Sequence, residues 1–277
     1  MSGLVLTLRD PPAQRVDMSA LTPDPLAGRK LDFVAALTLP CGNRKLRVDE
    51  LFEVSGTPVE PRDKARITIR NASPKLDRIG SAMVAGTIAV EGDAGAYAGF
   101  GMKGGRIEIS GNAGPFAAAV MSGGEIAIGG DAGDCLGSAL PGDRRGMRGG
   151  LVTVAGNAGA RIGDHLRRGM LLIAGDAGPY CGARMTAGTI AVLGRAADFI
   201  GFGMRRGTIL LAREPERMPA TFNDCGSHEL HFLSLMFEYA RGRGAAFAAL
   251  DGFGCRVRRL GGDRGVGGLG EILIRDA

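Results

Sequence analysis

Apolar and polar residues alternate along the middle of the chain in short runs that recur at a nearly constant interval. The apolar pairs are Ile88/Val90, Ile107/Ile109, Ile126/Ile128, Val152/Val154, Leu171/Ile173, Ile190/Val192 and Ile209/Leu211. Strict alternation over a few residues is typical of a β-strand with one buried face. No apolar stripe at the helical spacing of 3.6 residues occurs here, so this region is predicted to consist of short strands.

Each apolar pair belongs to a repeat that begins at a glycine. The unit starts are Gly86, Gly105, Gly124, Gly150, Gly169, Gly188 and Gly207. The interval is 19 residues, except for one step of 26 residues, in which seven residues are inserted within SALPGDRRGMRG. A degenerate unit containing Ile67, Ile69, Gly80 and Met83 precedes the first. At ~3.3 Å per residue, such a unit is roughly 60 Å long, which suits one coil of a parallel β-helix.

The units share further positions that stacking would bring into columns. The strand is followed by GDAG or GNAG, in which glycine would supply positive φ and Asp or Asn an Asx turn. Three residues before each unit stands Met83, Met102, Met121, Met147, Leu166, Met185 or Met204. Stacked coils would repeat these positions every ~4.8 Å and bury a continuous core that no single unit could form.

The fold expected from this pattern is all-β, a right-handed parallel β-helix of 19-residue glycine-rich coils over residues 63–213. A leucine-rich horseshoe would need an L-x-x-L-x-L core, and a hexapeptide helix a six-residue subperiod. Residues 1–62 are predicted to be a small N-terminal cap, with strands at Leu4–Leu8 and near Phe33–Leu39. Residues 214–277 are predicted to form a tail, with a helix over 227–241 and a last strand at Leu269–Ile274.

Composition narrows the possible functions. Tryptophan is absent and aromatic residues make up 5% of the chain, which disfavours an aromatic carbohydrate cleft or a base-stacking platform. No apolar run reaches the ~20 residues of a membrane span, and the N-terminus has no secretory pattern. Five scattered cysteines without a CxxC pair fit a reducing cytoplasm and disfavour a zinc or iron–sulfur site. The net charge of +5 suits an acidic partner without requiring nucleic acid.

Several residue columns are interpreted as structural. One carboxylate or amide per coil gives too few oxygens for calcium and no paired acid and base, so no catalytic residue and no metal site is predicted. His228 and His231, three apart on the expected helix, lack a third ligand, and Cys135 and Cys181 occupy packing positions. The recurring aromatic residues are expected to form a packed ladder or a partner-facing surface. They are Tyr97, Phe116, Tyr180 and Phe199.

A basic column is the candidate binding site. The second residue before each unit is cationic in four of seven cases, and two of these have a second arginine beside them. The inserted segment adds two more. The candidate residues are Lys103, Arg144, Arg145, Arg148, Arg167, Arg168, Arg205 and Arg206. Stacking would align them as a broken positive stripe, which is either an ordinary solvated face or a guide for a polyanion or an acidic partner chain.

The repeat, as in GDAGAYAGFGM (92–102) and GDAGPYCGARM (175–185), resembles a known β-helix domain over about residues 65–212. That domain is shared by the C-terminal part of glutamate synthase and by the C subunit of formylmethanofuran dehydrogenase and of its bacterial relative, the formyltransferase/hydrolase complex. The chain has the length of this C subunit and lacks the amidotransferase and flavin domains of a glutamate synthase. The C subunit is therefore the better match, and the arginine-over-lysine bias (29 Arg, 5 Lys) favours the bacterial complex.

The resemblance implies a scaffold function in one-carbon metabolism. In this family an amidohydrolase-like partner chain and a formyltransferase partner chain carry the chemistry, beside one further small chain. Together they move a formyl group from formyl-tetrahydromethanopterin to a methanofuran-like coenzyme and release formate during formaldehyde oxidation. That coenzyme carries a polyglutamate tail, for which the basic stripe is a reasonable track. Catalytic residues, nucleic acid and membranes are not expected for this chain.

Other interpretations remain open at this point. The chain could be the C subunit of a molybdenum or tungsten formylmethanofuran dehydrogenase, or an assembly module of a glutamate-synthase-like amidotransferase. A polysaccharide-degrading β-helix enzyme is disfavoured, because the carboxylate cluster and secretion signal of such enzymes are missing. Identification of the partner chains would separate these possibilities.

Overall fold

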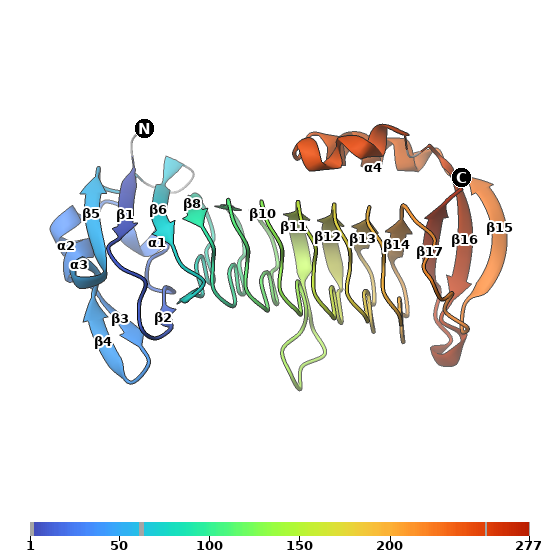
Figure 1. Ribbon diagram of the computed structural model, residues 1–277, viewed down its shortest axis with the longest axis horizontal. Coiled ribbons are helices and arrows are strands. Elements are labelled where there is room, and N and C mark those ends of the chain that lie inside the picture. The colour runs from blue at the N-terminus through green and yellow to red at the C-terminus, as the bar shows by residue number, and fades with distance from the viewer. Residues whose placement is uncertain (1–2, 61–63, 253, 277) are drawn as a thin grey trace.

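A computed structural model describes residues 3–60, 64–252 and 254–276, without the side chains of residues 249–252. Its main feature is a 13-stranded sheet that runs the length of the molecule, with the two ends of the chain at opposite ends of the stack (Figure 1). The order of the strands along this sheet is β15-β16-β17-β14-β13-β12-β11-β10-β9-β8-β6-β1-β5. The chain is therefore an elongated, mostly β structure, as predicted.

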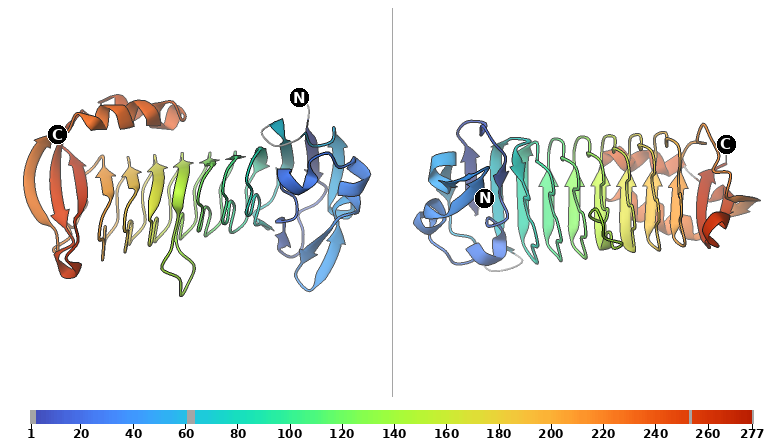
Figure 2. Two further views of the ribbon diagram at one scale, coloured as in Figure 1. Left: turned by 180° about the vertical axis from the view of Figure 1, so that it is seen from behind. Right: turned by 90° about the horizontal axis from the view of Figure 1, so that it is seen from below.

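Eight parallel strands form the coiled part. They are β6 (Arg66–Ala72), β8 (Thr87–Gly92), β9 (Arg106–Ile109), β10 (Glu125–Ile128), β11 (Arg148–Val154), β12 (Arg168–Ile173), β13 (Thr189–Val192) and β14 (Thr208–Leu211). Each unit pairs in register with the next, so that Ile88, Ile107 and Ile126 are aligned. Figure 2 shows the strands side by side along the stack. The parallel β-helix and its degenerate first coil are confirmed.

The interior of the coils is filled by aligned apolar columns. The methionine column is buried in every coil, with at most 1% of each side chain exposed. A further column of alanines links the turns through isolated parallel bridges from Ala94 to Ala196. Because a Cβ added at Gly99 would lie 2.2 Å from Cδ1 of Ile126, the return segment packs directly across a thin core from the strands.

The Asp/Asn column is structural, but its hydrogen bonds differ from the predicted Asx turns. Each side chain accepts a hydrogen bond from the backbone N–H of the equivalent residue one coil further on. The N–H of Asn112 donates to Oδ1 of Asp93 at 2.7 Å, and that of Asp131 donates to Oδ1 of Asn112 at 2.8 Å. The same bond continues to Asn157, Asp176 and Arg195. These side chains therefore connect neighbouring coils and do not close their own turns.

Most glycines of the GDAG and GNAG turns also have a different cause from the one predicted, since only Gly92, with φ of 124°, has positive φ. Positive φ occurs at the unit starts, for example 83° at Gly105, and at later corners, for example 67° at Gly99. Gly114 and Gly178, inside the turns, are not among the residues with positive φ. A Cβ at Gly114 would lie 2.7 Å from the carbonyl carbon of Gly95 in the preceding coil. Close backbone approach between coils therefore excludes a side chain there.

The N-terminal segment covers one end of the stack. Strand β1 (Leu4–Leu8) pairs in parallel with β6, and β5 (Phe52–Gly56) pairs antiparallel to β1 at the sheet edge. A second sheet has the order β4-β3-β2-β7. Its strands are β2 (Val16–Asp17), β3 (Thr38–Cys41), β4 (Arg44–Arg47) and β7 (Leu76–Asp77), and the helices nearby are α1 (Pro23–Leu26), α2 (Leu31–Ala36) and α3 (Val48–Leu51).

The predicted strand near Phe33–Leu39 is wrong over most of its length. Residues 31–36 form helix α2, and a strand starts only at Thr38. Val34 is buried against the main core while Phe33 remains 44% exposed. One buried contact per turn is enough to hold such a short helix, and its apolar residues do not alternate as they would in a strand.

The C-terminal segment closes the other end and then folds back. Strand β17 (Gly270–Arg275) pairs in parallel with β14, so the predicted last strand is confirmed. Beyond it lie β16 (Arg256–Gly262) and β15 (Asn223–Glu229), both antiparallel, with the short helices η2 (Ala245–Gly252) and η3 (Arg264–Val266) between the strands.

The predicted helix over 227–241 starts later than expected. Helix α4 covers Phe232–Arg241, while residues 223–229 belong to strand β15. His228 therefore lies in a strand and not on the helix, and the expected i, i+3 pair with His231 does not exist. Leu233, Phe237 and Ala240 do face inward, onto the outer surface of β11–β14. Figure 1 shows α4 running back along these strands.

Candidate functional site

The predicted basic column exists as a hydrogen-bonded stack. The N–H of Lys103 donates to the carbonyl of Met83, and the N–H groups of Arg148, Arg167 and Arg205 donate to the equivalent carbonyl one coil earlier, at 2.7–2.8 Å. Arg168 is paired in register with Arg148. Each coil therefore places this column position directly beside that of its neighbour, about 4.8 Å away, and Arg148 and Arg167 are cations on adjacent coils.

These cations are exposed and have no acidic partner. Among the described residues, no ion pair or side-chain hydrogen bond involves the six members of the row. They are Lys103, Arg148, Arg167, Arg168, Arg205 and Arg206. Many other arginines of the chain are paired, for example Arg258 with Asp224 and Arg184 with Asp164. We name these six residues the basic row.

Two short polar residues interrupt the basic row and two apolar residues end it. Ser122 and Thr186 occupy the same column, and the N–H of each donates to the carbonyl of the preceding coil at 2.8 Å. Val84 stands at one end of the column and Leu269 at the other, 48% and 76% exposed. From Lys103 to Arg205 the column makes five steps, or roughly 24 Å.

Arg144 and Arg145 lie outside this column. They stand on the exposed loop between Gly137 and Met147, which projects from the coil just before β11 (Figure 1). The N–H of Gly146 donates to the carbonyl of His165 at 3.0 Å, which holds the base of the loop against the next coil. The inserted arginines therefore sit at the edge of the row and do not extend its regular spacing.

An ion-pair cluster that the sequence analysis missed lies beside the loop. Asp164 is nearly buried and accepts hydrogen bonds from Arg184, with Nε of Arg184 2.9 Å from Oδ1. Arg161 approaches the same carboxylate at 3.4 Å. Desolvation by burial lowers the pKa of the neighbouring His165 below its usual value of 6.5. The sequence signal that could have revealed this cluster is an aspartate at a position that is Ser138 in the preceding coil and Ala183 in the next coil.

The other candidate residues do not assemble into a site. Among the described residues, no group of three or more His, Cys, Asp or Glu side chains could hold a metal ion. All five cysteines are free, and burial raises the pKa of the Cys181 thiol to about 12. His228 is exposed, and its Nε2–H donates to the carbonyl oxygen of Cys225 at 2.9 Å.

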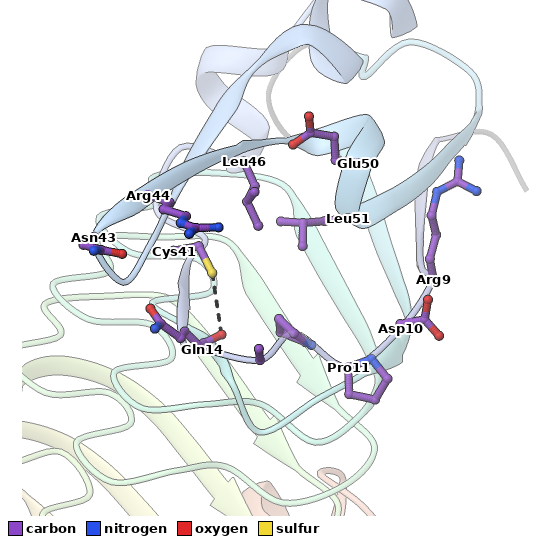
Figure 3. A pocket seen from close by; sticks show the side chains of 12 residues that line it. Arg9, Asp10, Pro11, Gln14, Cys41, Asn43, Arg44, Leu46, Glu50 and Leu51 are labelled. Atoms are coloured by element: carbon purple, nitrogen blue, oxygen red, sulfur yellow. Dashed lines mark hydrogen bonds between the residues drawn. The ribbon is translucent and has the colours of Figure 1, made fainter.

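A hollow of about 640 Å³ lies in the N-terminal cap, away from the basic row. Figure 3 shows Arg9, Asp10, Arg44 and Glu50 at its rim, so charges of both signs face it. The Cys41 thiol lies inside it, 3.8 Å from the carbonyl oxygen of Gln14. None of the candidate residues from the sequence lies in this hollow.

The arrangement of the basic row suits one kind of ligand. Exposed, unpaired guanidinium and ammonium groups along one column attract an extended anion along its length, through long-range attraction that salt screens. Exposed side chains of this kind give little shape selection, so they favour a flexible chain of carboxylates over a compact anion.

Two comparisons with known sequences agree with this architecture. The family model described as GXGXG motif matches residues 77–228, more than half of the chain. The C subunit of the tungsten-containing formylmethanofuran dehydrogenase 2 of Methanothermobacter marburgensis is 39% identical over 101 residues. The C subunit of the formyltransferase/hydrolase complex Fhc of Methylorubrum extorquens is 38% identical over 90 residues. These alignments span about a third of each relative, 37% and 32% of its length, and 36% and 32% of this chain.

A solved structure extends the likeness to the whole chain. A chain in the crystal structure of the formyltransferase/hydrolase complex FhcABCD from Methylorubrum extorquens, in complex with methylofuran, superposes with a TM-score of 0.89. It is 34% identical, and the match covers 99% of this chain and 100% of that chain. None of the described helices is long and apolar enough to cross a membrane. The chain belongs to the GXGXG-motif family, as a C subunit of the type found in formyltransferase/hydrolase complexes and formylmethanofuran dehydrogenases.

Proposed function

We propose that this chain is a non-catalytic scaffold subunit of a formyltransferase/hydrolase complex that acts in formaldehyde oxidation. Its partners would be an amidohydrolase-like chain, a formyltransferase chain and one further small chain. The complex would transfer a formyl group from formyl-tetrahydromethanopterin to a methanofuran-like coenzyme and release formate. The full-length similarity to a chain of a methylofuran-bound complex supports this assignment over the other members of the family.

The basic row would guide the polyglutamate tail of the coenzyme. The observation that carries this part is that four exposed cations share one hydrogen-bonded column, two more stand beside it, and none of the six has an ion pair in the described part of the chain. The column spans roughly 24 Å, which about seven extended residues would cover. Arg144 and Arg145, on the loop, would extend the attraction at the edge of the row.

Replacing the row tests this proposal directly. In the assembled complex, Lys103→Ser, Arg148→Ser, Arg167→Ser and Arg205→Ser together should weaken retention of methylofuran roughly tenfold at low salt, since each exposed contact contributes up to about 1 kcal/mol. The wild-type complex should lose affinity steeply as salt increases, and the variant should lose much less. Equilibrium dialysis of methylofuran at two salt concentrations measures both effects.

A matched control separates the row from net charge. The control carries Arg44→Ser, Lys45→Ser, Arg195→Ser and Arg213→Ser, four exposed cations away from the row, with the same change in total charge. It should retain methylofuran like the wild type. Unchanged retention and salt dependence in the row variant, or an equal loss in the control, would refute the guiding role while leaving the scaffold role standing.

The dehydrogenase remains a second candidate, because several matched relatives are C subunits of tungsten- or molybdenum-containing formylmethanofuran dehydrogenases. Purifying the native complex through a tag on this chain and identifying its partners by mass spectrometry decides between them. An amidohydrolase-like chain with a formyltransferase and no molybdopterin or iron–sulfur protein is expected. A tungsten or molybdenum protein would transfer the chain to the dehydrogenase, and a chain that is purified alone would refute the scaffold role.

A further inference from the structure

The outside of the return segments, opposite the long sheet, carries two nearly identical clusters of aromatic side chains capped by arginine. The first consists of Arg78, Tyr97, Phe100 and Phe116. The second consists of Arg161, Tyr180, Phe199 and Phe202. We name them the first and the second aromatic cluster. They are alike because one column of the coil holds the order Arg-Tyr-Phe twice, with Cys135 between.

The two clusters share most of their geometry, although Phe100 lies on the coil of its tyrosine and Phe202 on the next coil. In each, a tyrosine stacks on the phenylalanine of the next coil, with ring centroids 5.1 Å apart for Tyr97 and Phe116 and 4.7 Å for Tyr180 and Phe199. A further phenylalanine meets the tyrosine edge-on at 6.0 Å in both. The guanidinium of the arginine lies over the tyrosine ring, at 5.3 Å and 5.5 Å from its centroid. Both clusters are therefore ordered before any partner binds.

These aromatic residues occupy a costly backbone conformation. Tyr97, Phe116, Tyr180 and Phe199 have φ between 61° and 65°, in the left-handed region where glycine and asparagine are far easier to accommodate. Such conformations cost on the order of 1 kcal/mol or more per residue. Every residue of this column shares the conformation, including Cys135. Among the four aromatic residues Phe199 is 54% exposed, so burial within this chain does not offset the cost there.

The surface around the clusters has hollows and positively charged side chains, as protein–protein interfaces do. A hollow of about 270 Å³ lies beside the second cluster, between Phe199, Phe202 and Met218. Another, of about 350 Å³, lies between the clusters under the projecting loop, bordered by Phe116 and Arg161. The loop adds the exposed Arg144 and Arg145, whereas Arg78 and Arg161 are paired with Asp17 at 3.5 Å and with Asp164 at 3.4 Å. Tyrosine, phenylalanine and arginine are the residue types enriched in the centres of interfaces.

From this arrangement we propose that the two clusters form the docking face for a different protein chain, one whose contact surface is acidic and offers apolar side chains to the hollows. The inference deepens the proposed scaffold role and rests on it. The clusters are four coil steps apart, roughly 19 Å, so a single partner of ordinary size covers both. A second copy of this chain fits poorly, because a chain with a net charge of +5 would meet the same basic face with like charge.

The test uses the assembled complex and two variants of this chain. Phe199→Asn with Phe202→Ser removes the second cluster, and asparagine keeps the left-handed conformation accessible at position 199. The purified partner chains of the complex are the probe, and their dissociation constant for the tagged chain is the readout. The variant should bind roughly 30-fold more weakly, the effect of losing a typical hot spot. Arg78→Gln should lower the salt dependence of the same binding.

The control removes equally exposed apolar side chains elsewhere. Phe232→Ser with Leu235→Ser alters the outer side of α4, where these side chains are 53% and 70% exposed, and should change binding less than about twofold. Thermal unfolding of each isolated variant confirms that the coils are intact. Undiminished binding by the cluster variant, or an equal loss in the α4 control, would overturn the docking face although the scaffold role would stand. Loss of self-association alone would also overturn it, because the occupant would then be a second copy.

If the wild-type chain itself fails to bind the partner chains, the proposed function fails first. The two failures are therefore distinguishable in one experiment: the wild type tests the scaffold role, and the cluster variant tests the face.

Discussion

Strands β8–β10 and strands β11–β14 have the same register and the same interior, yet they present opposite chemistry on the outer side of the sheet. In the first group the outward residues are charged, polar or small, such as Ala89 and Ala127, and Arg106 pairs with Glu108 at 2.7 Å. In the second group Leu151, Leu172, Ala191 and Leu210 face outward and are buried under α4. The repeat therefore constrains only the residues on the inner face of the sheet. The residues on the outer face vary with what covers that part of the sheet.

The boundary between the two groups is a single ion-pair network. Arg243, just beyond α4, reaches Glu125 of β10 at 2.9 Å, and Arg106 approaches the same carboxylate at 3.4 Å. On one side of this network the sheet is open, and on the other it is covered by the chain itself. The covered half thus resembles a two-layer domain, whereas the open half relies on the interior columns alone.

The largest expected change in stability comes from placing a lysine on the outer face of the sheet, once in the half covered by α4 and once in the open half. Ala191→Lys puts an ammonium group beneath α4, where Ala191 is 3% exposed, and should cost about 3–5 kcal/mol or detach the helix. Ala127→Lys, at the same column position in β10, lies opposite Glu108 beside a hollow of about 430 Å³ and should change stability by less than about 0.5 kcal/mol. Urea unfolding of both variants measures the difference. Equal costs would mean that α4 does not cover the sheet in solution.

A smaller effect is expected at the boundary. Arg243→Gln removes the partly buried bond to Glu125 and should cost about 1 kcal/mol, since both side chains are largely shielded from water. Arg70→Gln serves as the control, because its pair with Glu91 at 3.4 Å is exposed and should contribute almost nothing. Hydrogen exchange in α4 should increase for the first variant only. A matching increase for the control would place the anchor of α4 elsewhere.

The smallest expected change in stability concerns His165, which lies on the return segments, on the opposite side of the coils from the outer face of the sheet. Burial holds the pKa of His165 below 6.5, while Asp164 raises it and Arg184 and Arg144 lower it. A lowered folded pKa means that the stabilisation is complete above about pH 6.5 and is lost as the pH falls through the lowered value.

His165→Asn, which keeps the left-handed backbone accessible, should therefore flatten the pH dependence of stability just below pH 6.5. Thermal unfolding of both proteins across that range is the measurement. An unaltered profile in the variant would assign the titration to other groups.

The repeat was predictable because stacking imposes one requirement on every coil. The apolar pairs, the methionine column and the 19-residue step specify strands, core and period at once, and the structure confirms all three. The basic row was predictable for the same reason, since equal positions in equal coils must align. Its function was not predictable from the stacking of the coils alone, because an exposed charged side chain can be solvated by water or can bind a ligand.

Two of the wrong predictions lie outside the repeat. Helix α2 and the start of α4 were misplaced, because neither has neighbouring copies that constrain it and tertiary contacts decide. The turn glycines and the Asp/Asn column were found, but their physical cause was wrong: the decisive neighbour is the backbone of the adjacent coil, which no single unit reveals. The ion pair of Asp164 with Arg184 depends on the same vertical neighbours.

The hydrogen bond that each Asp or Asn side chain accepts from the backbone N–H of the next coil fixes the spacing of the stack. Every coil adds about 4.8 Å to the stack and binds the next coil through the same hydrogen bond. A duplicated or deleted 19-residue unit would therefore change the length of the stack without changing the hydrogen bonds of the coils on either side. Two partners bound at different coils of the molecule are thereby held apart by a whole number of coil steps.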